Sequence, residues 1–415
     1  MSAVSVLEQR APRINKALHH YTTDPDLPLG QHAYQSPLRD ERLAAWLGAA
    51  LGILFTVCFL TGLFDHIQQH PLTWLPVPRR PLWLFRVTQG VHVACGIALM
   101  PVLIAKLWLV WPRLVSLPPF RKVADVVERV GLFALVGGGI FMVFTGIANI
   151  AQWYPWRFSF EASHYAVAWI TMGGLIAHLG AKWTITRRSL RRRSRRPGLA
   201  EAAVGAGGPL VAEGQHDGLT RRGFLVTVGS ASGILTLTTV GQTLRLFRRL
   251  AVLAPRAPGS GPQGHPVNRS AANAGVLASS ASPDYRLTVA GRVLTPLSLS
   301  LDDLASFPSH EATLPIACVE GWSYTARWRG IRLRDLLHAA GAPADAAVHV
   351  ISLEQHSPYS VSYVNHFQAH DIDTLLATHL DGKVLDPDHG YPLRLIGPDR
   401  PGVTQTKWVT SVVVL

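Results

Sequence analysis

The sequence is poor in cysteine, with only three in its 415 residues. Cys58 and Cys95 lie inside apolar stretches, where cysteine ordinarily serves as a small buried hydrophobic side chain. Cys318 is the only cysteine in the polar C-terminal region, so a disulfide within that region is excluded. A soft thiolate ligand to a metal is one role that a thiol without a partner can have.

Charged residues are also scarce. Asp, Glu, Lys and Arg make up 16% of the chain and hydrophobic residues 48%, a balance typical of a membrane protein. The net charge of +13 is spread unevenly, because Pro283 to Leu415 contains 10 basic and 14 acidic side chains. Seven arginines fall between Arg187 and Arg196. Such a run can bind nucleic acid. Because it directly follows an apolar stretch, we interpret it instead as a cytoplasmic anchor, with no nucleic-acid partner.

Long apolar stretches predict an all-α transmembrane helical bundle of four helices plus a fifth anchor helix. Each of the first four is near the roughly 20 residues that cross a bilayer core, and the fifth is shorter and rich in Gly, Ser and Thr. The stretches cover approximately 43–64, 84–111, 130–151, 163–183 and 223–244. The arginine run marks the inner end of the fourth stretch. The amino terminus and the 112–129 loop are therefore expected inside as well.

Two adjacent arginines open the fifth stretch, in the run Thr220-Arg221-Arg222-Gly223-Phe224-Leu225. The run resembles the twin-arginine export signal, here internal to the chain. The alternative is an ordinary positive-inside flank. Both interpretations send the chain outward at this helix, and an export route for folded proteins would suit a domain that acquires a cofactor in the cytoplasm.

The last part of the chain has the pattern of a globular α+β domain. Its strands are predicted at 285–289, 348–353 and 408–415, and its helices at 333–340 and 367–380. Gly341 is expected to end the first of these helices. With more than 100 residues, this domain is large enough to bury a core of its own.

The predicted organisation places the C-terminal domain on the outer side, periplasmic or extracellular, of a bacterial cell membrane. In chain order the parts are a cytoplasmic segment (1–42), a four-helix membrane domain (43–186), a basic cytoplasmic linker (187–219), the fifth helix (220–245), a flexible linker (246–282) and the α+β domain (283–415).

Three histidines lie within the predicted spans: His92 in the second, and His164 and His178 in the fourth. Because a histidine in a span is costly without a partner, each is a candidate functional residue. Facing helices of a bundle commonly hold cofactors, and two axial histidines would ligate the iron of a b-type haem. The alternative is that these histidines are bonded to neighbouring helices.

Depth along the helices favours one pair of haem ligands. We take Lys106 and Lys182 as markers of the inner membrane edge, which puts His92 14 residues from it, His164 18 and His178 4. At 1.5 Å per residue, His92 and His164 differ in depth by about 6 Å, against about 15 Å for His92 and His178. An outer haem held by His92 and His164 is therefore expected. His178 would ligate an inner haem or face a quinone.

Residues 283–415 resemble the sulfite-oxidase-type molybdopterin domain, a family that includes the catalytic subunit of the periplasmic methionine-sulfoxide reductase. The matching runs are Cys318-Val319-Glu320-Gly321-Trp322-Ser323, Asp388-His389-Gly390-Tyr391-Pro392-Leu393-Arg394 and Lys407-Trp408. The resemblance implies that Cys318 is the catalytic residue and binds molybdenum beside the pterin. It also implies that His389, Arg394 and Lys407 hold the pterin and its phosphate. The run Pro266–Ser270 resembles a segment that approaches the cofactor, which adds Asn268 and Arg269.

Two departures from that family matter. Thr404 stands where the family often has a second basic residue before the lysine. The basic substrate pocket of true sulfite oxidases has no clear match, so sulfite is not implied as the substrate. The first part of the chain, up to about residue 185, resembles the quinone-linked four-helix cytochrome b proteins, which include the haem-bearing membrane partner of the sulfoxide reductase.

The sequence therefore predicts a membrane-anchored, molybdopterin-dependent oxidoreductase. Molybdenum at Cys318 would exchange an oxygen atom with a small oxo-donor or oxo-acceptor substrate outside the membrane. Electrons would pass through b haem to or from a membrane quinone, with the cofactors carrying the redox chemistry. The alternative is a haem electron-transfer conduit whose outer domain is a non-catalytic binding module for a partner protein. Molybdenum content discriminates between the two.

Overall fold

The computed structural model describes residues 36, 38–72, 74–75, 77, 79–114, 123–191, 219–241, 246–256, 259–355 and 357–415. Most of the predicted cytoplasmic segment 1–42 and of the basic linker 187–219 therefore lies outside the described residues. The chain divides into two compact units. The first comprises Met1–Thr56, Gly96–Ile147 and Pro155–Leu235, and the second comprises Val57–Cys95, Ala148–Tyr154 and Thr236–Leu415.

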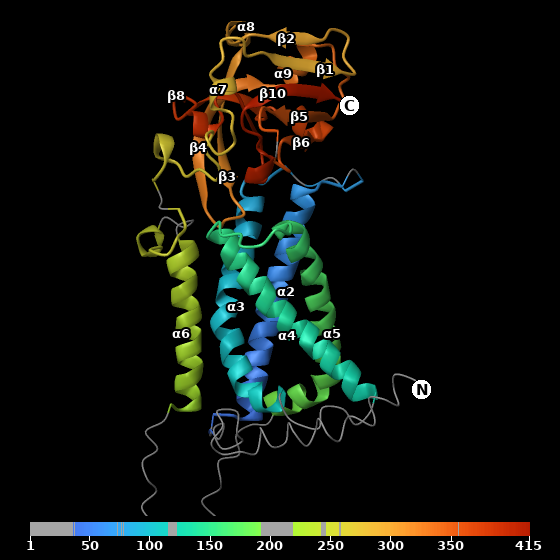
Figure 1. Ribbon diagram of the computed structural model, residues 1–415, viewed down its shortest axis with the longest axis vertical. Coiled ribbons are helices and arrows are strands. Elements are labelled where there is room, and N and C mark those ends of the chain that lie inside the picture. The colour runs from blue at the N-terminus through green and yellow to red at the C-terminus, as the bar shows by residue number, and fades with distance from the viewer. Residues whose placement is uncertain are drawn as a thin grey trace, which may run out of the picture. The chain divides into compact units, whose positions relative to one another are not determined.

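Each predicted apolar stretch forms a long helix (Figure 1). The helices are α2 (Glu41–Gln69), α3 (Leu84–Leu114), α4 (Val123–Ile150), α5 (Phe160–Arg191) and α6 (Arg221–Val240). Four candidate spans are long and apolar enough to cross a membrane: α2, Leu84–Trp111 of α3, Arg129–Ile150 of α4, and α6. Helix α5, over the predicted fourth stretch, is not among them, whereas α6, over the predicted fifth, is. The polar rings of His164 and His178 lower the apolar character of α5.

Small residues and apolar side chains pack the helices of the first unit. A buried cluster joins α2, α3 and α6; its members are Leu43, Leu47, Val102, Ala105, Leu109 and Val228. Gly174 allows α5 to approach α4, because a Cβ at that position would lie 3.2 Å from the carbonyl oxygen of Gly131. The helices are thus held by close backbone approach as well as by side-chain packing.

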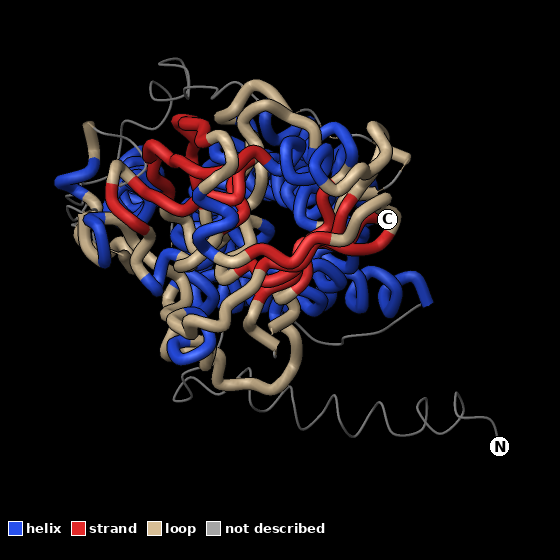
Figure 2. Tube along the Cα trace, turned by 90° about the horizontal axis from the view of Figure 1, so that it is seen from above, coloured by secondary structure: helices blue, strands red, loops and turns tan. Residues whose placement is uncertain are grey.

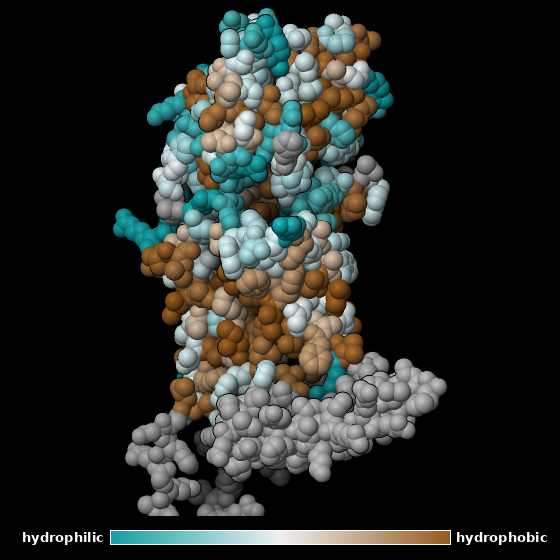
Figure 3. Space-filling view, in the orientation of Figure 1, coloured by the Kyte–Doolittle hydropathy of each residue, from teal (hydrophilic) through white to brown (hydrophobic). Residues whose placement is uncertain are grey.

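The outer surface of these helices is apolar. Ile53, Phe133 and Ile176 are 66%, 69% and 64% exposed. Figure 3 shows hydrophobic side chains gathered over the helices, whereas the domain that contains the sheets presents more hydrophilic ones. An apolar surface of this extent suits a lipid surrounding rather than water.

Two five-stranded sheets dominate the second unit, and Figure 2 shows their strands in red. The first sheet has the order β2-β1-β10-β5-β6, formed by Leu297–Leu299, Leu287–Gly291, Val409–Val414, Val348–Ser352 and Val361–Val364. Its only parallel pair is β1 with β10. The second has the order β3-β4-β7-β8 with β9 also on β7, formed by Ser309–Ala317, Ser323–Arg332, Leu375–Leu380, Lys383–Val384 and Arg394–Ile396. Strands β1, β5 and β10 confirm the three predicted strands.

Short helices complete the core of this unit. Helix α9 (Leu333–Ala339) confirms the helix predicted at 333–340 and buries Leu333, Leu336 and Leu337 completely. Gly341 follows it with a φ of +66°, a conformation that favours glycine. The remaining helices are α7 (Leu277–Ser280), α8 (Leu301–Ala305), α10 (His366–Ala369) and the 3₁₀ turns η3 (Arg248–Leu250), η4 (Pro262–Gly264), η5 (Pro387–His389) and η6 (Gly402–Thr404).

The helix predicted at 367–380 is wrong. Helix α10 ends at Ala369, and Leu375–Leu380 is strand β7. The carboxylate of Asp371 accepts the Asp373 amide at 3.0 Å, and the Asp371 carbonyl accepts the Thr374 amide at 3.1 Å, so a turn separates the two elements. Strand β7 then pairs with β4 on one side and with β8 and β9 on the other. A central strand is apolar on both faces, which explains why the pattern resembled a helix.

Truncation of the core should destabilise this unit. Leu336 is fully buried, so we expect Leu336→Ala to lower the free energy of unfolding by about 2–5 kcal/mol, through lost apolar burial and a residual cavity. Leu294→Ala, at a side chain 87% exposed, is the matched control and should change it by at most about 0.5 kcal/mol. Denaturant unfolding of the detergent-purified chain, followed by tryptophan fluorescence, measures both. Equal effects of the two substitutions would contradict this core.

Candidate cofactor site

Cys318 lies in the loop that joins β3 to β4. Antiparallel pairing of the two strands ends at Ala317 opposite Ser323, which leaves Cys318–Trp322 as the connection. The Cys318 amide donates to the Trp322 carbonyl at 2.9 Å, and the Gly321 amide donates to the Cys318 carbonyl at 3.0 Å. Gly321 has a φ of +84°, so the tight loop depends on a glycine at that position. The hairpin therefore fixes the position of the thiol.

The Cys318 side chain is only 3% exposed, and its burial raises the pKa of the thiol. The negative charge of Glu320 acts in the same direction, while Lys407 and Arg256 lower the pKa. A free thiolate is thus disfavoured at this position. A bound metal cation would replace the thiol proton, and the two nearby basic side chains would favour an anionic sulfur.

Glu320 fixes the same loop from within. Its carboxylate accepts a hydrogen bond from Trp322 Nε1 at 2.7 Å and another from Gln152 Nε2, and it lies 3.7 Å from Arg256 Nε. Burial raises the pKa of Glu320, while these donors lower it. Sequence reasoning missed Arg256 and Gln152. They come from segments far from the loop in sequence, so no local pattern marks them.

The three residues that the resemblance assigns to the pterin lie near one another. Arg394, at the start of β9, donates through Nη1 to the carbonyl oxygen of His389 at 3.1 Å. Lys407 Nζ donates to the carbonyl oxygens of Arg269 at 2.5 Å and Asp388 at 2.9 Å. Gly390 allows this approach, because a Cβ there would lie 3.0 Å from Lys407 Cβ.

Burial shifts the protonation of these groups. It lowers the pKa of His389 to about 4, and the charges of Arg394 and Lys407 add to that effect. His389 is therefore neutral at pH 7, and its Nε2–H donates to the Pro262 carbonyl at 2.7 Å, which leaves Nδ1 as an acceptor. Burial also lowers the pKa of Lys407 to about 7, again reinforced by Arg394.

Asn268 and Arg269 lie beside this group. The Asn268 carbonyl accepts from Gln152 Nε2 at 3.0 Å, and Arg269 Nε forms an ion pair of 2.6 Å with Glu354. The backbone of Arg269 meets Lys407, as given above. The segment assigned to a linker by sequence thus contributes directly to the site, and Ala271 within it is fully buried.

Two further groups escaped the sequence analysis. His265 stacks on Tyr324 with ring centroids 4.3 Å apart, and its Nε2 lies 2.7 Å from the Asp381 carboxylate. Burial raises the pKa of Tyr324 to about 12, with a nearby Arg394 opposing it. Arg400 is buried, and burial lowers its pKa to about 10. No sequence pattern marked Arg400, because its burial is visible only in the structure.

The buried cations of this site fit an anionic cofactor. Within the described part of the chain, neither Arg394 nor Lys407 forms an ion pair with a carboxylate. Arg394 Nε is a buried donor without a hydrogen-bond acceptor, and Ser323 Oγ beside the Cys318 loop is likewise unsatisfied. Unsatisfied buried donors and unpaired buried cations are costly, and phosphate oxygens would satisfy both. Together with a buried thiol, this donor set is chemically suited to a molybdenum-pterin cofactor.

His92 and His164 have matching hydrogen bonds, each described within its own unit. His92 Nδ1 lies 2.8 Å from the Cys58 carbonyl oxygen, and His164 Nδ1 lies 3.0 Å from Thr145 Oγ1. The Thr145 hydroxyl donates to the Phe141 carbonyl at 2.7 Å, so it accepts from His164. In both rings Nδ1 therefore carries the proton and Nε2 the lone pair, which is the tautomer of an Nε2 iron ligand. His178 lies half-buried in α5.

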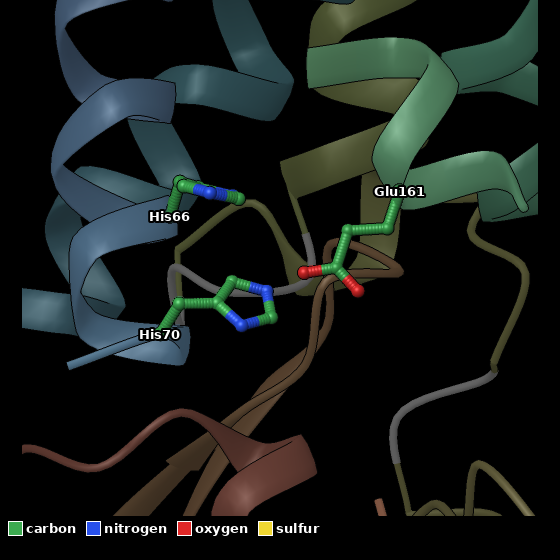
Figure 4. A group of neighbouring side chains, drawn as sticks. All are labelled: His66, His70 and Glu161. Carbon is green, nitrogen blue, oxygen red and sulfur yellow. The ribbon is translucent and has the colours of Figure 1, made fainter. Parts of the chain in front are cut away.

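Two other histidines lie at the C-terminal end of α2. Figure 4 draws His66 and His70, whose ring centroids are 4.6 Å apart. They follow Cys58, the contact of His92, by eight and twelve residues. At 1.5 Å per residue this separates them from that contact by about 12 and 18 Å along the helix. They are therefore separate from the His92 contact.

Comparison with known proteins supports the cofactor site. Residues 274–415 match the family model described as the oxidoreductase molybdopterin binding domain. Mitochondrial sulfite oxidase of Mus musculus is 34% identical over 157 residues, which cover 31% of this chain and 29% of that protein. The oxidoreductase YuiH of Bacillus subtilis is 32% identical over 31% of this chain and 64% of its own length.

A third relative is the protein-methionine-sulfoxide reductase catalytic subunit MsrP of Campylobacter jejuni, 28% identical over 31% of this chain and 48% of its own. The chain therefore spans less than two thirds of the length of each of these relatives. Among solved structures, the sulfane dehydrogenase SoxCD of Paracoccus pantotrophus is 26% identical over 32% of this chain and 38% of its own, with a TM-score of 0.29. The expected molybdopterin-binding oxidoreductase domain is confirmed by the family match.

Removal of the Arg394 guanidinium, whose Nε has no acceptor, should release the cofactor. We expect Arg394→Gln to lose hydrogen bonds to an anion worth about 1.5–3 kcal/mol, and hence to weaken retention about 10- to 100-fold. Molybdenum per chain, measured by elemental analysis of the purified protein, reports this loss. Arg292→Gln, at a side chain 60% exposed, is the control and should keep the wild-type content. Full molybdenum in Arg394→Gln would exclude this residue from the cofactor site.

Proposed function

We propose that the chain is a membrane-anchored molybdenum-cofactor oxidoreductase, coupled through b haem to the quinone pool. It exchanges an oxygen atom with a small substrate outside the membrane, either in sulfoxide reduction or in sulfite-like oxidation. The names of the relatives support this substrate class, since one is a sulfite oxidase and another a protein-methionine-sulfoxide reductase subunit.

One observation within the second unit supports the proposed coupling between oxygen-atom exchange at molybdenum and electron transfer through haem. The carbonyl oxygen of Val319, next to Cys318, accepts from Gln89 Nε2 of α3 at 3.5 Å. The neighbouring Gly321 faces Val93, where a Cβ on the glycine would lie 3.1 Å from Val93 Cγ1. His92 stands between these two contacts in sequence. The loop that bears the candidate molybdenum ligand thus rests on the turn of helix that bears a candidate haem ligand.

The residues of the chain have distinct roles in this proposal. The bound molybdenum cofactor supplies oxygen-atom exchange coupled to the transfer of two electrons. Cys318 holds the metal, and Arg394 and Lys407 hold the anionic part of the pterin by charge-assisted hydrogen bonds. Neutral His389 accepts through Nδ1 and is oriented by its bond to the Pro262 carbonyl. The Glu320 network holds the Cys318 loop against displacement.

The histidine tautomers support the haem part of the proposal. A haem iron takes its axial ligands from Nε2 when Nδ1–H is bonded to an oxygen, as in both His92 and His164. Gly62 of α2 allows the ring of His92 to lie against that helix, because a Cβ there would come within 2.6 Å of His92 Cε1. His178 keeps its proposed place as a ligand of an inner haem or as a neighbour of the quinone. The haem supplies single-electron transfer between quinone and the outer domain.

Orientation and location are part of the same proposal. The C-terminal domain lies on the outer side of the bacterial cell membrane, reached through α6, whose first residues include Arg221 and Arg222. The alternative function is a haem conduit with a non-catalytic outer module. It does not explain why the Nε donor of Arg394 is buried without an acceptor. It predicts haem without molybdenum.

Replacement of the metal ligand should abolish turnover and spare the haem. Loss of outer-shell partners of a metal costs about 10- to 100-fold, so Cys318→Ser, which removes a direct ligand, should cost at least about 100-fold in turnover. Sulfoxide or sulfite is added to the purified protein while the haem oxidation state is followed. Cys95→Ser is the matched control and should turn over normally. Turnover that survives in Cys318→Ser would remove the catalytic assignment.

Replacement of the proposed axial ligand should remove the haem. We expect His92→Ala to lose the b-type absorbance bands, since the iron loses one of its two axial nitrogens. Reduced-minus-oxidised spectra of the detergent-purified protein measure this. His70→Ala, at the outer end of α2, should keep the wild-type spectrum. An unchanged spectrum in His92→Ala would discard the proposed pair of ligands.

A further inference from the structure

Two buried carboxylates lie close together in the second unit, outside the cofactor site. Asp65 of α2 is 2% exposed, and Asp399, in the loop after β9, is 6% exposed. Gln68 lies one turn after Asp65 on the same face of α2, and its Nε2 donates to Asp399 Oδ2 at 3.3 Å. The two acids thus share one polar environment, in which a second ionised carboxylate is disfavoured by the first.

Asp399 is well stabilised as an anion. Its Oδ1 accepts the amide of Phe85 at 2.7 Å, and Phe85 is the second residue of α3. The unpaired amides and the dipole at the start of a helix favour a negative charge there. Burial raises the pKa of Asp399 to about 6, with Phe85 and Gln68 opposing that shift. At pH 7 this carboxylate is therefore mainly charged.

Asp65 has poorer partners. Its Oδ1 accepts from Thr88 Oγ1 at 2.5 Å, but the single proton of that hydroxyl also lies within reach of the Leu84 and Phe85 carbonyls, at 3.2 and 3.1 Å. Asp65 Oδ2 is buried without a donor, and Gln68 Oε1, on the same face, is buried without one as well. A proton on the Asp65 carboxyl supplies a donor where these atoms have none.

The titratable groups around Asp65 act in opposite directions, since the charge of Asp399 disfavours a second carboxylate anion, whereas a charge on His92 would favour it. Among the described residues, no cation forms an ion pair with Asp65. The titratable groups that face it are Cys58 on its own helix, His92 on α3 and Asp399 on the loop after β9. Arg400, beside Asp399, directs its Nη groups to Gln368 and to the carbonyls of Tyr363 and Thr404.

We propose that Asp65 is a proton-binding site paired with Asp399, protonated at neutral pH while Asp399 stays charged. The two acids have different partners, so one of them stays ionised and the other carries the proton.

Infrared spectroscopy tests the protonated acid without any cofactor. The detergent-purified full chain at pH 7 should show the carbonyl stretch of a carboxylic acid that disappears in Asp65→Asn. Asp302→Asn, at an exposed acid of α8, is the control and should leave that band intact. Identical spectra for wild type and Asp65→Asn would overturn the proposal.

A second variant tests the pair while Asp65 is kept. Asp399→Asn removes the neighbouring charge but keeps an oxygen for the Phe85 amide, so Asp65 should ionise at a pH lower by about one unit. An infrared titration of the Asp65 band measures this shift. A band that titrates at the same pH in Asp399→Asn would exclude coupling between the two acids.

Discussion

Burial of positive charge without a carboxylate partner is the constraint on which the C-terminal domain depends. Arg394 and Lys407 are enclosed by β9, the Cys318 loop and the turn around His389, and desolvation lowers the pKa of each. A buried guanidinium with an unsatisfied Nε is unfavourable in the domain by itself. Since an anion would raise the pKa of Lys407 again, binding of a phosphate-bearing cofactor takes up a proton and stabilises the fold around it.

The Cys318 loop also contacts helical residues of the second unit. The Val319 carbonyl accepts from Gln89 and also from Asn149, whose Nδ2 lies 3.5 Å away. Ion pairs add a second attachment, since Arg79 lies 2.9 Å from Asp371 and Arg80 2.7 Å from Asp373. Contacts at both places hold the thiol-bearing loop at a constant position on α3. In the proposed function, an electron path through this loop would need no movement of the domain.

Sequence reasoning succeeded where the information was local. Alternating residues identified β1, β5 and β10, and the run around Cys318 marked a domain whose family match is now established for residues 274–415. It failed at β7, because a strand with neighbours on both sides has no alternation. It could not find Gln152 or Asp65, whose partners Glu320 and Asp399 are 168 and about 334 residues away along the chain. The haem ligands and the domain boundaries remain predictions.

Helix α5 differs from the other long helices in its apolar character. It fails the composition expected of a membrane span although it is longer than α6, which meets it. The polar residues that separate the two include His164, whose Nδ1–H is already satisfied by Thr145. In the proposed function Nε2 of His164 is an iron ligand, and this role would offset the cost in apolar character. The same reasoning applies to His92 against Gly62.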